Sequence, residues 1–441
     1  MLKQQAKKMA DYRFIKYCVS LPFSDEVTLL FNTLTSEMLE IKNDELDQQN
    51  VCDELIRHWM LVPKDFEEKE LTRQVISTAL LMQNKHKENV SYYTIMTTTD
   101  CNARCFYCYE KGRSMIPMNT ETALKTAEYI KKHSGDNAVE LRWFGGEPLY
   151  NINVIDIICQ KLCEYNIEYT SKIISNGYLF DNDIVKRAVD QWNLKSVQIT
   201  LDGTENVYNQ CKNYIYKDGS AYQRVIDNIN KLLAAKVRVL VRLNLDLHNA
   251  DDLLDLMDEL NGCLENKENL NVYARPLIEK STIEPYVRSE ECRAEVYRKL
   301  FVLEEKIAKL GLEGKDGLRK RFMLNHCMAD SGNSVVITPT GDITLCEYHS
   351  DDEFVGSIFS DELDADMIKS WKERCEDIPE CADCPCYPEC IRLKKCAEQV
   401  DCYKETREWK IRKIKQGMLN EYKRYLKKNN GETENDDWED C

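Results

Sequence analysis

The chain has 441 residues, 43% of them hydrophobic, which is enough to bury a sizeable core in two or three domains. Its 76 acidic residues outnumber its 60 basic ones, and the net charge of −16 argues against a nucleic-acid partner, because such binding depends on neutralising phosphates. No apolar run reaches the roughly 18 to 20 residues that span a bilayer, so we expect no membrane insertion.

Cysteine is the unusual residue, with 20 in the chain. The first residues form a polar run and show no apolar export signal. In a reducing compartment, cysteines serve as metal ligands more than as disulfide partners. We therefore expect a cytoplasmic protein whose grouped cysteines bind metal.

The first 88 residues predict a small α+β module. Residues 14–21 and 26–31 are expected to pair as strands, and the runs 37–41 and 51–57 are expected to be helical. One interpretation of this module is a structural cap on the domain that follows, and the alternative is a peptide-binding module.

Residues 89–285 alternate short apolar runs with amphipathic helical stretches. The apolar runs read as strands at 90–97, 139–144, 172–175, 196–200, 237–243 and 271–275. This βαβ repetition predicts an α/β domain with a parallel sheet and right-handed crossovers. Asn176-Gly177 and Asp202-Gly203 mark loops at strand ends, where such folds bind ligands.

Cys101, Cys105 and Cys108 directly follow the first of these strands. Iron–sulfur clusters normally take one cysteine for each iron, so three thiolates leave one iron of a four-iron cluster open for a substrate, as an open coordination position does in catalytic zinc sites. The alternative is a structural or zinc site, since a cysteine-rich chain can produce this spacing by accident.

Several polar or small residues at later strand ends suggest a ligand cradle. Gly145 and Gly146 allow close approach of the backbone, Arg242 offers a fork of donors for a carboxylate, and Asn244 offers an amide for hydroxyls. Ordinary alternatives exist, because a glycine pair is often a turn and an arginine often forms a surface ion pair. For Asn176 and Thr200, each taken singly, we favour an ordinary structural role over a role in ligand binding.

A second set of cysteines is dense between residues 327 and 402. Its members are Cys327, Cys346, Cys381, Cys384, Cys386, Cys390, Cys396 and Cys402. Metal ligation is favoured over disulfides, and a zinc ribbon built on Cys381-x2-Cys384 is the simplest competitor. Beyond it, residues 411–441 predict a helix that ends in a solvated acidic tail.

The first cysteine motif resembles the signature of radical S-adenosylmethionine (SAM) enzymes, Cys-x3-Cys-x-aromatic-Cys, with Tyr107 as the aromatic residue. The segment 142–148 is similar to the family's Gly-Gly-Glu-Pro motif, and by that resemblance Gly145, Gly146, Glu147 and Pro148 surround the methionine amino group. Segments 174–177, 198–203 and 241–244 resemble the motifs of the next three strands. The resemblance implies that Ser175, Asn176, Thr200, Arg242 and Asn244 contact the ribose and carboxylate.

The later cysteines resemble the SPASM extension of radical SAM enzymes, which carries two auxiliary 4Fe–4S clusters. By that resemblance Cys381, Cys384, Cys390 and Cys402 hold one cluster, and Cys327 and Cys346, with Gly341 before the latter, belong to the other. The family has a further cysteine where this chain has Lys394. Cys396 is the nearest substitute and would leave an open iron, whereas recruitment of Cys386 would close the cluster.

The resemblance implies a partial (β/α)6 barrel over 89–285, a linker helix and SPASM domain over 286–410, and a terminal helix and tail over 411–441. It implies a peptide maturase that uses SAM and three 4Fe–4S clusters, with an electron donor of the flavodoxin or ferredoxin type. The phrase Phe31-Asn-Thr-Leu-Thr35 resembles a leader-binding module that grips a precursor peptide by strand addition.

A thioether crosslink is the favoured product. One alternative is a sulfatase maturase that makes formylglycine, and the other is a non-catalytic iron–sulfur or zinc protein.

Overall fold

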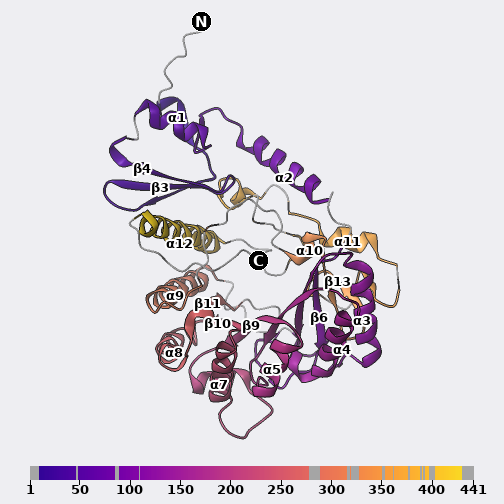
Figure 1. Ribbon diagram of the computed structural model, residues 1–441. Coiled ribbons are helices and arrows are strands. Elements are labelled where there is room, and N and C mark those ends of the chain that lie inside the picture. Colours follow the sequence, from indigo (N-terminus) through magenta and orange to yellow (C-terminus); the bar gives the residue numbers. More distant parts are fainter. Residues whose placement is uncertain are drawn as a thin grey trace.

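The computed structural model describes residues 9–45, 48–84, 89–108, 110–277, 289–314, 318, 327–349, 353–360, 362–375, 378–387, 390, 393–396 and 403–429. Figure 1 shows a small N-terminal module, a larger α/β body, and a long C-terminal helix between them. The predicted Cys402 and the acidic tail lie outside the described residues.

The N-terminal module has two small antiparallel sheets. One has the strand order β2-β3-β4, and the other pairs β1 with β5. The bounds are β1 Tyr12–Phe14, β2 Cys18–Pro22, β3 Val27–Asn32, β4 Glu37–Lys42, α1 Gln49–Arg57, β5 Leu61–Pro63 and α2 Glu68–Asn84, with short 3-10 turns at Met9–Asp11 and Asn43–Glu45. The predicted strand 14–21 is therefore split between β1 and β2, while the helix predicted at 51–57 is confirmed.

The expected helix at 37–41 is wrong, because these residues form β4. Asn32 at the end of β3 is buried, and its side-chain oxygen accepts hydrogen bonds from the backbone of Leu34 at 2.9 Å and Thr35 at 3.2 Å. The resulting turn brings residues 37–42 back alongside β3 in antiparallel register. Pairing with a neighbouring strand overrides the local pattern here.

Six parallel strands in sequential order form the centre of the larger body. They are β6 Tyr92–Thr98, β7 Val139–Gly145, β8 Tyr169–Ser175, β9 Leu194–Leu201, β10 Arg238–Leu245 and β11 Leu270–Pro276. Every neighbouring pair is parallel, and this order is that of a partial barrel. The predicted α/β fold with a parallel-sheet core is confirmed.

Helices lie between successive strands and cover one side of this sheet (Figure 1). They are α3 Thr120–His133, α4 Ile152–Glu164, α5 Asn182–Asp190, α6 Glu205–Lys212, α7 Ala221–Ala234 and α8 Ala250–Cys263, with 3-10 turns at Pro148–Asn151 and Lys267–Asn269. Polar residues begin several of them: the Asn119 side chain accepts from the backbone N–H of Thr122, and that of Asp181 accepts from Ile184.

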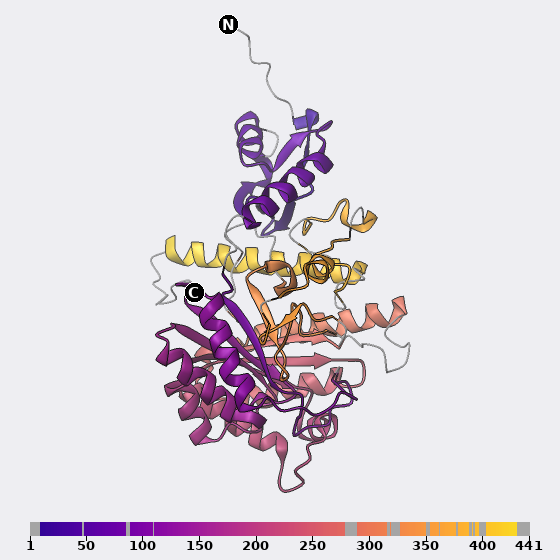
Figure 2. The same ribbon diagram turned by 90° about the vertical axis from the view of Figure 1, so that its right-hand side faces the viewer.

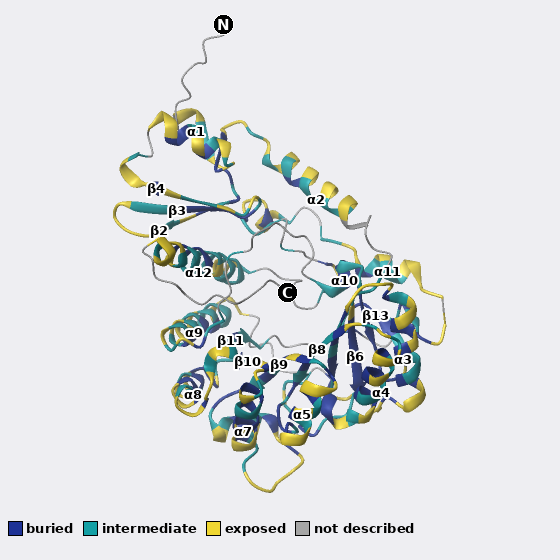
Figure 3. Cartoon of the chain, viewed as in Figure 1, coloured by how far each residue is buried: buried dark blue, intermediate teal, exposed yellow. Residues whose placement is uncertain are grey.

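The two faces of the sheet differ in chemistry. Along β9, Val197 and Ile199 are fully buried under the helices, whereas Gln198 and Thr200 between them are half-buried. The same alternation runs along β8 and β10, since side chains on a strand point to opposite faces. One face thus belongs to the buried hydrophobic core (Figure 3), and the other, which carries Gln198 and Thr200, is a half-buried polar inner face.

The C-terminal part extends the sheet and then leaves it. β12 pairs in parallel with β6 and forms an antiparallel hairpin with β13, to which β14 is added. The bounds are α9 Glu290–Lys309, α10 Met328–Ser331, β12 Ser334–Ile337, β13 Asp342–Thr344, β14 Gly356–Ser357, α11 Ala365–Trp371, a 3-10 turn Pro379–Cys381 and α12 Lys404–Asn429.

Helix α12 lies between the N-terminal sheet and the barrel, as both views show (Figures 1 and 2). Met418 and Tyr422 on α12 are buried against Val19, Leu29 and Phe31 of the N-terminal sheet. The helix also contacts α9, where Lys413 pairs with Glu304 at 2.7 Å. Among the described helices, none is both long enough and apolar enough to cross a bilayer.

Candidate functional site

The loop that leaves β6 carries the first cysteine motif at the carboxyl end of the parallel sheet. Cys101, Cys105 and Cys108 are free thiols of intermediate exposure. The pKa of the Cys101 thiol is raised to about 12, mainly by burial and next by the charge of Glu147. The charges of Cys105 and Cys108 add to the rise. The three thiols therefore lie near enough to influence one another.

Hydrogen bonds to later segments fix this cluster loop, residues 99–108. The backbone N–H of Arg104 donates to the carbonyl of Lys212 at 2.8 Å, and the backbone carbonyl of Asn102 accepts from Ile215 at 2.9 Å. Within the loop, the N–H of Ala103 donates to the Cys101 sulfur at 3.3 Å. The loop is thus anchored to the segment that follows α6.

Gly145 and Gly146 at the end of β7 lie against the same loop. A Cβ atom at Gly145, where φ is +119°, would be 2.1 Å from the Thr98 carbonyl oxygen, and one at Gly146 would be 2.3 Å from that of Asp100. The close approach predicted for this glycine pair is therefore made to the backbone at the end of β6 and at the start of the cluster loop. Only glycine fits at these two positions without moving the loop.

Glu147 follows the glycines and is fully buried. Its carboxylate accepts hydrogen bonds from the backbone of Asn176 at 2.8 Å, the Ser175 hydroxyl at 2.9 Å and the backbone of Leu149 at 3.2 Å. These contacts join the ends of β7 and β8. The next residue, Pro148, begins the 3-10 turn and is also buried. Glu147 thus acts here as a brace between strands.

Asn176 connects the end of β8 to the cluster loop. Its side-chain amide nitrogen lies 2.7 Å from the Asn102 side-chain oxygen and 3.7 Å from the Cys101 sulfur. Its side-chain oxygen accepts from the backbone of Tyr178, as in a turn. Both interpretations of this residue, turn former and site residue, therefore have a contact to support them.

Arg242, Thr200 and Asn244 meet on the polar inner face. Arg242 and Thr200 are paired across β10 and β9, and the Arg242 Nε donates to the Asn244 side-chain oxygen at 3.1 Å. The Asn244 amide in turn donates to the Asp202 carboxylate at 3.1 Å. The three predicted residues form one polar strip beside the cluster loop.

Asp202 and Lys212 lie beneath this strip as a buried ion pair. The Lys212 Nζ is 3.1 Å from the Asp202 carboxylate, and their side chains are 4% and 1% exposed. The Tyr107 hydroxyl donates to Asp202 at 2.8 Å and accepts from Lys212 at 2.8 Å. Burial acts to lower the pKa of Lys212, but the charges of Asp202, Tyr107 and Cys105 together oppose it and hold the pKa well above its usual value.

The later cysteines form two groups. In the first, burial raises the pKa of the Cys346 thiol to about 12, and after Glu347 the charges of Cys327 and Cys396 add to the rise. Burial also raises the pKa of the Cys327 thiol, and the charge of Cys396 adds to that rise. Cys396 thus lies near enough to Cys327 and Cys346 to influence both thiols.

The second group lies in the segment 381–390. The sulfurs of Cys384 and Cys386 share a hydrogen bond that lowers the pKa of Cys384 to about 6, and the charge of Cys390 acts on Cys386. Cys381 ends the 3-10 turn before them and its carbonyl accepts from the Cys384 N–H at 3.3 Å, while the Lys410 Nζ on α12 donates to the Cys390 sulfur at 2.8 Å. The predicted partner Cys402 lies outside the described residues.

Comparison with known protein families gives a match for the central part of the chain. Residues 95–260 match the model of the Radical SAM superfamily. This chain contains a radical SAM domain. The match covers β6 through most of α8, the region that holds the cluster loop and the polar inner face.

The curated relatives of this chain have names that point to different substrates. GTP 3',8-cyclase of Clostridium perfringens is 26% identical over 282 residues, 60% of this chain and 83% of the relative. The sporulation killing factor maturation protein SkfB of Bacillus subtilis is 23% identical over 171 residues, 38% of each chain.

Two solved structures share the fold. Native anSMEcpe with bound AdoMet and Cp18Cys peptide has a TM-score of 0.54 at 15% identity, covering 78% of this chain and 100% of that one. Streptococcus suis SuiB has a TM-score of 0.51 at 13% identity, covering 89% and 97%. At this identity the likeness concerns the fold.

A radical SAM domain implies a 4Fe–4S cluster and SAM. The three thiols of the cluster loop are ligands of the kind that a 4Fe–4S cluster requires. A thiol as buried as Cys101 loses its proton at neutral pH only if a strong positive charge, such as that of iron, stabilises the resulting thiolate. Among the described residues, no three His, Cys, Asp or Glu side chains converge closely enough to share one metal ion. A cluster requires a wider arrangement, because each cysteine binds its own iron.

Sequence analysis missed Asp202 and Lys212 as a pair. Asp202 was noted only as part of a strand-end motif, and the position of Lys212 at the end of α6 carries no motif at all. The pair could have been predicted only from a lysine on the helix that follows a strand ending in aspartate. This pattern is too common to identify a functional pair from one sequence.

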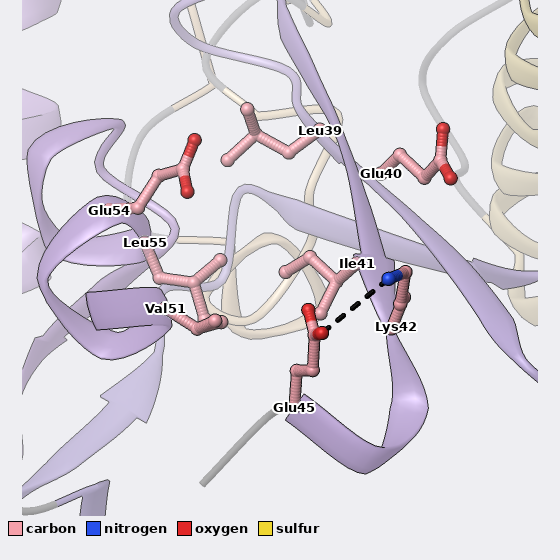
Figure 4. A pocket seen from close by; sticks show the side chains of 8 residues that line it. All are labelled: Leu39, Glu40, Ile41, Lys42, Glu45, Val51, Glu54 and Leu55. Atoms are coloured by element: carbon pink, nitrogen blue, oxygen red, sulfur yellow. Dashed lines mark ion pairs between the residues drawn. The ribbon is translucent and has the colours of Figure 1, made fainter. Parts of the chain in front are cut away.

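The N-terminal module has a hollow of about 160 Å³ between the edge strand β4 and helix α1 (Figure 4). Its floor is apolar, with Leu39 and Ile41 from β4 and Leu55 from α1. Its rim carries acidic residues, among them Glu54, while Lys42 is paired with Glu45 at 3.5 Å. The chemistry of the hollow suits an apolar side chain flanked by basic groups.

Proposed function

We propose that this radical SAM enzyme is a maturase that installs a crosslink, preferably a thioether, in a ribosomally made precursor peptide. The observation that carries the proposal is the placement of three cluster-loop cysteines beside a polar inner face, together with a separate group of Cys327, Cys346 and Cys396. The relation to SkfB, a maturation protein, and the peptide bound to anSMEcpe support a peptide substrate.

With a cluster and SAM bound, the site would supply a 5′-deoxyadenosyl radical for abstraction of a hydrogen atom from a substrate carbon. In this proposal Cys101, Cys105 and Cys108 hold the cluster. Arg242 binds the carboxylate of SAM, and Asn244 and Thr200 face its ribose. The glycine pair and Glu147 keep β7 and β8 against the loop and exclude water from the reacting groups.

The preference for a thioether follows from the chemistry of sulfur and from the auxiliary cysteines. Joining a cysteine sulfur to a carbon removes one hydrogen atom from the carbon and the proton from the thiol, and it releases one electron that needs an acceptor. We assign that acceptor to an auxiliary iron–sulfur cluster. Three thiols, Cys327, Cys346 and Cys396, leave one iron of such a cluster able to bind the substrate thiolate.

The remaining assignments belong to the same proposal. Cys381, Cys384, Cys390 and Cys402 hold a second auxiliary cluster, and a flavodoxin- or ferredoxin-type protein supplies the electron for SAM cleavage. Residues 1–88 bind the leader of the precursor, 89–285 form the catalytic barrel, 286–410 carry the auxiliary clusters, and 411–441 form the terminal helix and tail.

The test is mass spectrometry of a cysteine-containing candidate peptide co-expressed with the enzyme. We expect the peptide to lose two hydrogens and to become resistant to thiol alkylation. The matched control replaces Cys101, Cys105 and Cys108 with Ala, which should abolish 5′-deoxyadenosine formation. A peptide converted to formylglycine would favour the sulfatase-maturase alternative, and SAM cleavage by the triple variant would refute the cluster assignment.

A further inference from the structure

We propose that the buried Lys212–Asp202 ion pair positions the cluster loop and sets the reduction potential of the cluster held there. The inference rests on the proposed assignment of Cys101, Cys105 and Cys108 as cluster ligands. It gives a positioning role to Asp202, which the segment 198–203 contains without an assigned role, and to Lys212, which lies outside the sequence motifs.

The pair joins three segments at one point. Asp202 follows β9, Lys212 ends α6, and Tyr107 stands in the cluster loop between Cys105 and Cys108. The Tyr107 hydroxyl donates to the Asp202 carboxylate at 2.8 Å and accepts from the Lys212 Nζ at 2.8 Å. The side chain of the loop residue is therefore held by both charges.

Lys212 also holds the loop through its backbone. Its carbonyl oxygen accepts from the Arg104 N–H at 2.8 Å and lies 4.0 Å from the Cys105 sulfur. The end of α6 thus contacts the loop from both its main chain and its side chain. A movement of Lys212 would displace the residues on both sides of Cys105.

Burying two charges is costly, and an apolar pair of the same volume often stabilises a fold equally well. The Lys212 and Asp202 side chains are 4% and 1% exposed. The presence of a charged pair at this buried position is explained if its charges act on a neighbouring group. The nearest group whose charge changes in the proposed reaction is the cluster.

The two charges act on the Cys105 sulfur with opposite signs. Both charged groups contact the hydroxyl of Tyr107, two residues from Cys105, and the Lys212 carbonyl oxygen lies 4.0 Å from the Cys105 sulfur. Reduction adds one electron from the flavodoxin- or ferredoxin-type donor and breaks no bond in the protein. A positive charge therefore favours the reduced cluster, and a negative charge disfavours it.

This opposition gives a test that a merely structural role would not pass. Lys212→Met leaves Asp202 alone, so the midpoint potential of the cluster should become more negative. Asp202→Asn leaves Lys212 alone, so the potential should become more positive. The double variant should return near the wild type. We expect each single change to alter the reduction equilibrium constant about tenfold, or 59 mV for one electron.

The measurement is a redox titration followed by electron paramagnetic resonance, on reconstituted full-length protein whose auxiliary cysteines are intact. The matched control is the exposed pair of Lys299 and Asp251, 2.5 Å apart, whose replacement by Met and Asn should leave the potential unchanged. Shifts of the two single variants in the same direction, or no shift, would overturn the role in setting the potential.

Tyr107→Phe tests the positioning role and serves if a single charge variant fails to fold. It removes only the hydroxyl that joins the pair to the loop, so a chelator should remove iron from this cluster at least about threefold faster than from the wild type. An unchanged rate would overturn the positioning role. Failure of the wild type to assemble a cluster on Cys101, Cys105 and Cys108 would instead refute the proposed function.

Discussion

Glu147 illustrates how a single residue can match a family motif and still have a local duty of its own. The resemblance places it near the methionine amino group. In the structure its carboxylate accepts three hydrogen bonds from the ends of β7 and β8 and is fully buried. A motif identifies the residue, but only the fold shows which of its atoms are already engaged.

The burial of Glu147 predicts a pH-dependent stability. Burial raises its pKa from 4.5 to about 7, against the opposing hydrogen bonds. The folded state therefore keeps a proton that the unfolded chain releases, and the free energy of unfolding should fall as pH rises from about 4.5 to 7. The loss is on the order of 3 kcal/mol.

Chemical denaturation of the apoprotein at pH 5 and pH 8 measures this loss. Glu147→Gln should remove about half of the difference between the two pH values, because burial also raises the pKa of Glu110 to about 7 and that carboxyl supplies the rest. It should also cost roughly 1 to 3 kcal/mol at pH 5, because an amide cannot accept all three hydrogen bonds. Glu128→Gln, on the exposed face of α3, should keep the wild-type dependence. An equal dependence in both variants would contradict the role of Glu147.

Cys396 and Cys386 give the second prediction at this scale. Cys396 groups with Cys327 and Cys346, while Cys386 shares a hydrogen bond with Cys384. Cys396→Ala should therefore remove about four irons and stop peptide modification, with SAM cleavage retained. Cys386→Ala should be nearly silent in iron content. If Cys386 proves essential and Cys396 dispensable, the ligand assignment is reversed.

At the level of elements, the sequence was sufficient for the central sheet and less so for the N-terminal module. The six parallel strands are short apolar runs separated by helical patterns, so their period and spacing identified them. Residues 37–41 carry apolar side chains that suit a helix or a strand, and the antiparallel partner β3 decides between the two. Such long-range pairing is not encoded in local periodicity.

The edge strand β4 leads to a prediction about peptide binding. If the hollow beside it receives the leader, Glu54→Lys should repel the leader's basic residues and Leu39→Asn should remove part of the apolar floor. Each change should weaken binding of a fluorescent leader peptide about tenfold, equivalent to 1.4 kcal/mol. Glu67→Lys, outside the hollow, is the matched control. Unchanged affinity in both hollow variants would make the module a structural cap.

On the scale of the whole molecule, α12 connects parts that the sequence keeps far apart. It packs on the N-terminal sheet through Met418 and Tyr422, on α9 through Lys413, and on the second cysteine group through Lys410. The sequence predicted a terminal helix but no partners for it, because its hydrophobic residues alone do not specify which distant surface they cover.

The N-terminal module also contacts the second cysteine group directly. The Lys16 Nζ donates to the Ala382 carbonyl at 3.0 Å, and the Thr33 hydroxyl donates to that of Pro385 at 2.5 Å. Thr33 belongs to the phrase at 31–35 that resembles a leader-binding module. The module that we propose binds the leader is therefore also a wall of the proposed auxiliary site.

Deleting residues 1–85 should consequently have two separable effects. SAM cleavage should persist, since its proposed contacts all lie later in the chain, and affinity for the full precursor should fall far more than affinity for a leaderless core. In addition, the truncated protein should lose about four irons, because Lys16 and Thr33 no longer hold the segment 381–390 and the apolar face of α12 is uncovered.

Iron analysis and 5′-deoxyadenosine formation, measured on the same preparation, separate these effects. The double variant of Lys16→Met and Thr33→Val is the matched control, because it removes the two contacts while leaving the hollow and the cover of α12 in place. It should lower auxiliary iron and keep leader affinity. If the truncated protein retains all its iron, the module touches the cysteine segment without supporting it, and leader binding and cluster assembly are independent.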